Sequence, residues 1–249
     1  MLIHNAAGNF SFISGIAPFS FGCVADKGYE IVHASLHPLP ELWEGLDLVE
    51  RHITALGRPL NALCGIELRV PQAFSPEGFA RFNRPYQEKL AQWKLGVNGR
   101  NPVARTNVAE QAAPVTEPSV YGFSYTIPST HPDPTFILAG APEARLTESG
   151  FEIVAEGDTS TDGLRRKLEF ILETTSGWLG ELARGWDDAT RLNLYTIHHI
   201  HPLIESTIAP ATKTAPRNGL CWYYARPPVD RFDLELDARG VRQEQILRP

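Results

Sequence analysis

The sequence has few cysteines, no long hydrophobic run and no segment with the features of a secretion signal. Its three cysteines, Cys23, Cys64 and Cys221, are odd in number and widely spaced, which argues against a disulfide framework and favours free thiols in a reducing compartment. No apolar stretch approaches the roughly 18 residues that a membrane-spanning helix needs. The N-terminal segment lacks a basic region followed by an apolar core. We therefore expect a cytoplasmic protein that does not enter a membrane.

Positive charge is also scarce. The 249 residues include 23 Lys and Arg against 29 Asp and Glu, a net charge of −6, and the basic residues form no cluster. Nucleic-acid binding requires concentrated positive charge, so this balance argues against it. The hydrophobic fraction of 43% and the charged fraction of 21% are typical of a soluble globular protein. The expected partner is a small molecule.

The clearest pattern lies between residues 164 and 201. Apolar residues recur there at intervals of three and four, which predicts a helix over 164–182 with one buried side. The pattern then changes to period two over 191–196, where Leu192, Leu194 and Thr196 share one face. A strand is therefore predicted to follow the helix and to cover its apolar side.

The same pattern occurs earlier in the chain, shifted by 126 positions, and most of the aligned pairs are hydrophobic on both sides. The pairs are Leu42 with Leu168, Leu46 with Leu172, Val49 with Thr175, Ile53 with Leu179, Leu56 with Leu182, Ile66 with Leu192, Leu68 with Leu194 and Val70 with Thr196. A repeat of two copies is too short for a solenoid, so it predicts two related domains. The Pro-rich segment 128–134 is the expected linker, with domains over 1–127 and 135–249. Each copy is expected to begin with a hairpin, FSFISGIAP with YEIVHASL and FILAGAPEARL with GFEIVAEG.

Short motifs recur in the same order in both copies. The first copy has Phe12-Ile13-Ser14-Gly15, Phe82-Asn83-Arg84-Pro85-Tyr86 and Pro102-Val103-Ala104-Arg105-Thr106-Asn107-Val108. The second has Ile137-Leu138-Ala139-Gly140, Pro216-Arg217-Asn218 and Asp233-Leu234-Glu235-Leu236-Asp237. This order resembles the RidA/YjgF family of imine and enamine deaminases. The resemblance implies an α+β fold of two tandem RidA/chorismate-mutase-like domains, each a mixed β-sheet with helices packed on one face. It also implies a homo-oligomer, a trimer above all, with pockets between neighbouring domains.

Two arginines match the family arginine that binds the substrate carboxylate, Arg105 and Arg217. A planar guanidinium can hold a carboxylate through two parallel hydrogen bonds, which lysine cannot do. An interface ion pair is the alternative interpretation for both. The family's acid, which positions the attacking water, corresponds to Asp233 or Glu235 in the second copy, whereas the matching stretch SVYGFSYT of the first copy has no acid.

The histidines near the end of the predicted strand allow three interpretations. His199 and His201 project to one face and His198 to the other, so only two could meet at a metal unless the chain turns at Pro202. Metal ligation, general acid/base catalysis beside Arg217 and a structural role remain open, and we assign His199 and His201 to proton transfer, with no metal. Trp222 is a candidate to stack on a flat substrate, although strand aromatics are commonly core residues.

The prediction from the sequence is a hydrolytic deaminase that acts on the C–N bond of a small carboxylate-bearing imine, enamine or amino-dienoate, without an organic cofactor. Arg217, or Arg105 at the other type of interface, would hold the carboxylate, Asp233 or Glu235 would activate water, and His199 or His201 would protonate the leaving nitrogen. The alternatives are a chorismatase-like hydrolase or lyase on a cyclic carboxylate and a non-catalytic protein that binds a small ligand.

Overall fold

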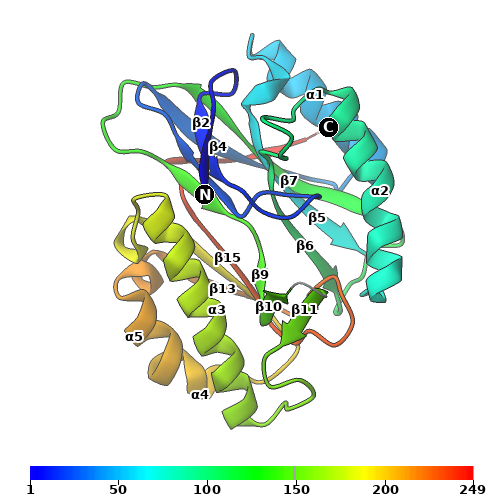
Figure 1. The fold of residues 1–249 in the computed structure, drawn as a ribbon, viewed down its shortest axis with the longest axis vertical. Coiled ribbons are helices and arrows are strands. Elements are labelled where there is room, and N and C mark those ends of the chain that lie inside the picture. Colours follow the sequence, from blue (N-terminus) through cyan, green and yellow to red (C-terminus); the bar gives the residue numbers. More distant parts are fainter. Residues whose placement is uncertain (148–149, 249) are drawn as a thin grey trace.

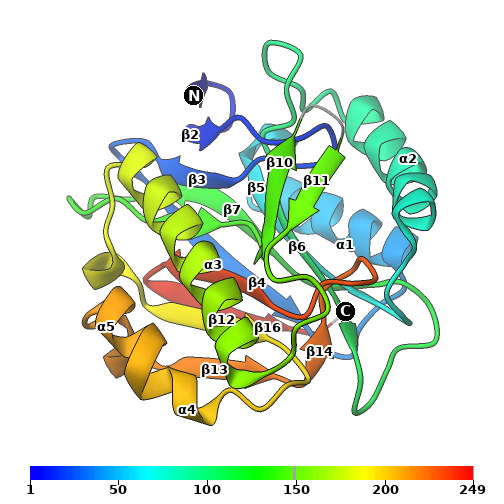
Figure 2. The same cartoon turned by 60° about the horizontal axis from the view of Figure 1, so that its bottom comes forward.

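Two β-sheets form the centre of the molecule, and the helices lie on their outer sides (Figures 1 and 2). The structure is a computed structural model and describes residues 1–147 and 150–248. No helix within these ranges is long and apolar enough to span a membrane. The combination of these sheets and helices makes the chain a mixed α+β protein, as the sequence predicts at this coarse level.

The first sheet has six strands in the order β14-β6-β5-β7-β4-β16. Its strands are β4 (Tyr29–Leu36), β5 (Leu63–Val70), β6 (Ala104–Glu110), β7 (Ser119–Pro128), β14 (Ala225–Arg226) and β16 (Gln243–Leu247). Two helices cover one face, α1 (Leu42–Ala55) and α2 (Pro76–Gln92) (Figure 1). Leu42, Leu46, Val49 and Ile53 of α1 are buried at helical spacing, so the helix presents one apolar side to the sheet.

The second sheet has eight strands, in the order β1-β2-β3-β8-β15-β12-β13 with β9 beside β15. These strands are β1 (Leu2–Asn5), β2 (Phe10–Ile13), β3 (Gly22–Ala25), β8 (Phe136–Leu138), β9 (Ala141–Pro142), β12 (Arg191–Tyr195), β13 (Leu220–Tyr223) and β15 (Glu235–Gly240). The long helix α3 (Thr161–Glu181) packs on it, and shorter helical segments follow, α4 (His201–Leu203), η3 (Ile204–Ile208), α5 (Ala209–Thr212) and η4 (Ala215–Asn218). A separate hairpin consists of β10 (Ala144–Thr147) and β11 (Gly150–Ile153).

Three apolar clusters account for this arrangement. One lies between α1, α2 and the first sheet, and a second between α3 and the second sheet. The third joins the two sheets and includes Phe12, Cys64, Ala104 and Ile137. Polar contacts add to it, because Arg239 of β15 pairs with Glu67 of β5 at 3.1 Å. The sheets are therefore held together by a core of their own.

The two sheets share one pattern of pairing. The first contains the run β4-β7-β5-β6 and the second β8-β15-β12-β13, and in both the last pair is parallel and the others antiparallel. A helix lies between β4 and β5 and another between β8 and β12, as the repeat predicts.

The first expected hairpin is wrong, because β2 pairs with β3 and not with β4, which belongs to the other sheet. The second is confirmed in part: the segment FILAGAPEARL supplies three strands, and the last of them, β10, pairs with β11 of GFEIVAEG. Strands also cross the expected linker. Strand β3 pairs with β8, whereas β16 pairs with β4 and β14 with β6, so each sheet contains strands from both sides of residues 128–134. Two compact domains over 1–127 and 135–249 remain a prediction.

Candidate active site

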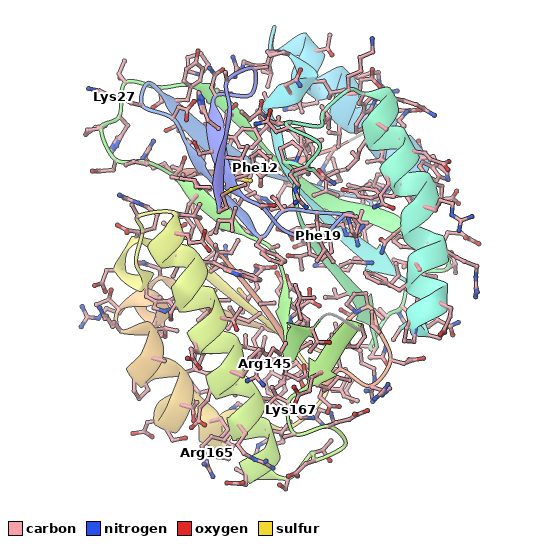
Figure 3. The ribbon with its side chains drawn as sticks, viewed as in Figure 1. Phe12, Phe19, Lys27, Arg145, Arg165 and Lys167 are labelled. Carbon is pink, nitrogen blue, oxygen red and sulfur yellow. The ribbon has the colours of Figure 1, made fainter. Side chains whose placement is uncertain are left out.

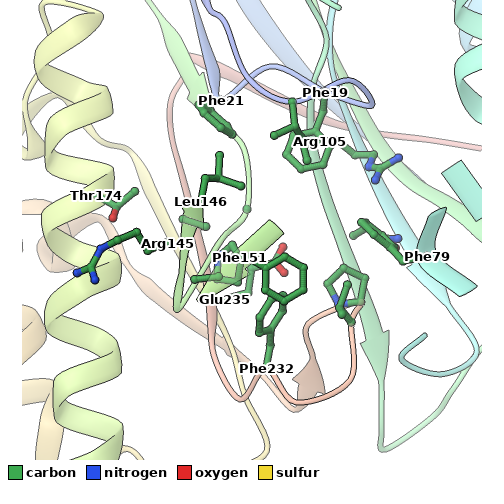
Figure 4. Close-up of a pocket in the computed structure, with 18 of the residues that line it drawn as sticks. Phe19, Phe21, Phe79, Arg105, Arg145, Leu146, Phe151, Thr174, Phe232 and Glu235 are labelled. Carbon is green, nitrogen blue, oxygen red and sulfur yellow. The ribbon is translucent and has the colours of Figure 1, made fainter. Parts of the chain in front are cut away.

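A cavity of about 430 Å³ lies where the two sheets, α3 and the β10–β11 hairpin meet (Figure 4). Most of its lining is apolar and includes Phe19, Phe79, Phe151, Trp178 and Phe232. The polar side chains of the lining are few, and they include Arg105, Asn107 and Glu235. An apolar pocket with a small number of polar groups is the usual form of a small-molecule site.

Arg105 is held in the wall of the cavity by strand β6. The side chain is only 3% exposed, and the guanidinium carbon lies 4.8 Å from the ring centre of Tyr86, 5.0 Å from that of Phe19 and 5.5 Å from that of Phe79. Among the described residues, no acceptor makes a hydrogen bond to its Nη1 or Nη2. Burial lowers the pKa of Arg105, and the nearby Tyr86 and Glu235 oppose that effect. A buried guanidinium with two free donors is suited to bind an anion in the cavity.

Asn107 lies two residues further along β6 and therefore on the same face of the sheet. Its side-chain oxygen and nitrogen are buried, and neither has a hydrogen-bond partner within residues 1–147 and 150–248. Because an unmade hydrogen bond in a buried position costs about 1–3 kcal/mol, such a group marks a place where a ligand or water completes the site. Asn107 offers a donor and an acceptor beside Arg105.

Glu235 begins strand β15 and reaches the same cavity from the second sheet. It is 3% exposed. Burial and the neighbouring Asp237 raise its pKa well above the usual range, while Arg105 and the backbone amide of Asn107 oppose the shift. This shift favours the protonated form of the carboxyl group, which can act as an acid.

The approach of Glu235 depends on Gly140. A Cβ atom at this position would lie 1.8 Å from Oε1 of Glu235, so no residue with a side chain fits there without moving the carboxyl group. The amide of Gly140 also donates to the carbonyl oxygen of Arg105 at 3.2 Å. Gly140 thus brings the segments that carry Arg105 and Glu235 close together.

Asp237 lies two residues after Glu235 on β15 and is buried between the two sheets. Its carboxyl oxygens accept hydrogen bonds from Thr106 and Asn193 at 2.8 Å and from Tyr195 at 2.9 Å. Burial raises the pKa of Asp237, and the carboxylate of Glu67 adds to the shift. This network fixes the direction of β15, in which Glu235 is the first residue.

A second buried cluster joins Glu143, Lys167, Asp233 and His198. Lys167 extends from α3 (Figure 3) and is fully buried. It lies 3.8 Å from Glu143 and makes a short contact to Asp233. Glu143 accepts hydrogen bonds from the amides of Asp233 at 2.6 Å and Leu234 at 3.1 Å. Burial raises the pKa of Glu143 to about 7 despite these bonds. The cluster ties the segment before Glu235 to the segment before Ala144, and both segments line the cavity.

The structure brings together Arg105 and Glu235 but not Arg217. The pairing registers explain the difference, because Arg105 lies beside Ile66, and Leu220 lies beside Leu192, the counterpart of Ile66. The structural counterpart of Arg105 is therefore Leu220, and equating Arg217 with Arg105 is wrong. Arg217 lies in the short 3₁₀ helix η4, is exposed, and does not line the cavity.

The remaining sequence candidates also lie outside the cavity lining. Asp233 is held by Lys167 and by His198, whose Nε2 lies 2.8 Å from Oδ1 of Asp233. His199 and His201 are exposed, with ring centres 5.3 Å apart. Trp222 lies in β13 and donates to the carbonyl oxygen of Thr196 at 2.8 Å. Within the described ranges, no group of three or more His, Cys, Asp and Glu residues could hold a metal ion.

Sequence reasoning missed Asn107 and the aromatic wall. Asn107 belongs to the motif that contains Arg105, and its spacing of two along a strand is the signal that places it on the same face. Phe79 lies in α2 and lines the cavity. Helical periodicity identifies an inward side and cannot distinguish a core from a pocket.

Comparison with known proteins agrees with a deaminase. The profile of a family described as 2-aminomuconate deaminase CnbZ matches residues 2–245. A 2-amino-5-chloromuconate deaminase from Comamonas testosteroni is 38% identical over 244 residues, which cover 96% of this chain and 96% of that protein. A solved structure described as a chorismatase covers 96% of this chain and 79% of its own at 10% identity, with a TM-score of 0.46.

Proposed function

The chain belongs to the 2-aminomuconate deaminase CnbZ family and is a deaminase that acts on the C–N bond of a carboxylate-bearing amino-dienoate. We propose that 2-aminomuconate is its substrate. We propose further that the reaction occurs in the cavity lined by Arg105, Asn107 and Glu235. The observation that supports this proposal is that one cavity holds a guanidinium and an amide without hydrogen-bond partners among the described residues, together with a carboxyl group whose pKa is raised by burial. Such a set matches a substrate that carries a carboxylate and must receive a proton.

Arg105 holds the carboxylate next to the amino-bearing carbon. Its two free Nη donors can make parallel hydrogen bonds to the two carboxylate oxygens. The surrounding rings of Phe19, Phe79 and Tyr86 exclude water from this contact and strengthen it. This contact fixes the amino-bearing carbon within the cavity.

Glu235 begins the reaction as an acid. Its carboxyl group donates the proton to a carbon of the conjugated enamine, which turns the C–NH₂ group into an iminium ion. Water then adds to the iminium carbon, and the carboxylate of Glu235 accepts a proton from that water. The resulting carbinolamine passes its hydroxyl proton to the nitrogen and loses ammonia, and the product is a 2-oxo acid. One water enters and one ammonia leaves, and Glu235 ends in its initial state.

Asn107 completes the site beside Arg105. Its free amide nitrogen can donate to the substrate carboxylate, and its free oxygen can orient the attacking water. The apolar remainder of the cavity accommodates the diene carbons.

The test is the release of ammonia from 2-aminomuconate, followed together with the loss of the dienoate absorbance. We expect Glu235→Gln to lower kcat by about 10²–10⁴-fold, the usual contribution of general acid/base catalysis. The chlorinated analogue 2-amino-5-chloromuconate, which the name of the Comamonas testosteroni relative suggests, provides a second substrate. If the wild-type protein released no ammonia from either compound, the proposed substrate would be wrong.

We also propose that the two halves derive from one RidA-like module. The matching strand orders β4-β7-β5-β6 and β8-β15-β12-β13 support this origin. A homotrimer is the proposal that follows from the resemblance, and a cytoplasmic location is the proposal that follows from the few, widely spaced cysteines. Light scattering of the purified protein tests the trimer.

A further inference from the structure

The charge of the cavity does not match a ligand with a single carboxylate. Two guanidinium groups belong to its lining, those of Arg105 and Arg145. Glu235 is the acidic residue of the lining, and burial raises its pKa well above the usual range, which favours its neutral form. The cavity therefore carries an excess of positive charge, which a dianion would balance.

Arg145 stands in a wall different from that of Arg105. It belongs to strand β10, and Figure 4 shows it on the side of the cavity toward α3, whereas Arg105 lies on the side of the first sheet. The stretch between them is apolar and includes Phe21, Leu146 and Phe151. Two cations separated by an apolar stretch match a chain molecule with a carboxylate at each end.

The present contacts of Arg145 are weak. Its guanidinium lies 5.4 Å from the ring centre of Phe170 in α3, and Nη1 lies 3.6 Å from Oε2 of Glu152. The side chains of Arg145 and Glu152 are 59% and 65% exposed. An exposed ion pair at this distance adds little stability, so the long side chain of Arg145 can turn toward the cavity at small cost.

We propose that Arg145 binds the distal carboxylate of the substrate while Arg105 binds the carboxylate next to the amino group, so that Arg145 selects dicarboxylates. This inference rests on the proposed function, because it assigns an orientation to the same substrate in the same cavity. Arg145 contributes to binding of the distant end and not to the transfer of protons. Its loss therefore affects KM and leaves kcat nearly unchanged.

A structural role for Arg145 makes a different prediction. Arg145 and Glu152 stand directly opposite each other in the hairpin, and such cross-strand pairs stabilise strand pairing. If the pair served only the hairpin, Arg145→Gln and Glu152→Gln would have the same effect. If Arg145 binds the ligand, Glu152→Gln frees the guanidinium and leaves binding at least as tight.

The experiment uses two probes that need no turnover. Binding of 2,4-hexadienedioate and of 2,4-hexadienoate is measured by calorimetry for the wild type, Arg145→Gln, Glu152→Gln and the control Arg165→Gln. Arg165 is exposed on α3, pairs with Asp162 and is not part of the cavity lining. We expect Arg145→Gln to weaken binding of the dicarboxylate about 10-fold and of the monocarboxylate less than about 2-fold, because only the former has a second charge-assisted contact to lose.

Three results would overturn the inference: no loss with the dicarboxylate, equal loss with both probes, or equal loss in Arg145→Gln and Glu152→Gln. The KM for 2-aminomuconate provides the second readout, with an expected rise of about 10-fold and a kcat within about 2-fold of the wild type. Failure of the proposed function is recognised separately. A wild-type protein that binds the dicarboxylate through Arg145 but releases no ammonia would refute the deaminase reaction on 2-aminomuconate and not the role of Arg145.

Discussion

Replacing Arg105 with methionine should raise stability and destroy activity, two effects of opposite sign. The lowered pKa of Arg105 means that its surroundings as a whole disfavour the charge, even with three aromatic rings within 5.5 Å. A buried charged group without a partner costs more than the roughly 1–3 kcal/mol of a neutral one, and each aromatic contact returns about 1 kcal/mol. We therefore expect Arg105→Met to increase the free energy of unfolding, and each 1 kcal/mol gained raises Tm by about 2–4 °C in a chain of this length.

The loss of activity follows from the same two Nη atoms. Two charge-assisted hydrogen bonds to the substrate carboxylate are worth about 3–5 kcal/mol together, so kcat/KM should fall by about 10²–10⁴-fold. Thermal unfolding by circular dichroism and ammonia release measure the two effects on one preparation. Arg217→Met is the matched control, because Arg217 is exposed outside the cavity lining and neither quantity should change. An Arg105→Met protein that loses stability together with activity would show that the residue is structural, and one that retains activity within tenfold would exclude it as the anchor.

Two further substitutions test the surroundings of Glu235. Gly140→Ala should lower kcat at least about 10-fold with the fold retained. The new Cβ would lie 1.8 Å from Oε1 of Glu235 and would therefore displace that carboxyl group. A kcat equal to that of the wild type would contradict this prediction. Glu143 has its pKa raised from 4.5 to about 7 in the folded state, so its contribution to stability is fully present below about pH 4.5 and is lost as the pH rises to 7. The variant Glu143→Gln has no such loss. The unfolding free energy of the variant minus that of the wild type, measured in urea, should therefore rise by about 3 kcal/mol between pH 4.5 and 8. A difference that does not change with pH would contradict this prediction.

The helices and the strands that follow them could be predicted because each has one side of regularly spaced apolar residues. In α1 and α3 the apolar residues recur at three and four, and in β5 and β12 at two, which are the periods that the backbone imposes. The partners of β2 and β4 could not be predicted in this way. Both strands are buried and apolar, and periodicity does not say which strand a given strand pairs with.

The misplacement of Arg217 had a signal against it. Pro216 precedes it and Gly219 follows with φ of +118°, a conformation that favours glycine. A proline and a glycine within four residues favour a turn and are poor in a central strand, so this segment could not match the strand that carries Arg105. The two segments contain similar residue types, but their backbone requirements differ, and the backbone requirements should have decided against the match.

The matched positions of the two sheets carry different residues, so in the described part of the chain the cavity takes Arg105 from the first sheet and Glu235 from the second. In the second sheet, Leu220 is the counterpart of Arg105. In the first sheet, Ser119 is the counterpart of Glu235, because Ser119 pairs with Arg69 as Glu235 pairs with Tyr195. A cavity built from Leu220 and Ser119 would have neither a guanidinium to hold a carboxylate nor a carboxyl group to supply a proton. The first half thus supplies Arg105 and the second half supplies Glu235. In the proposed mechanism the reaction uses both halves, and the third apolar cluster, which joins the sheets, holds these two groups in the walls of one cavity.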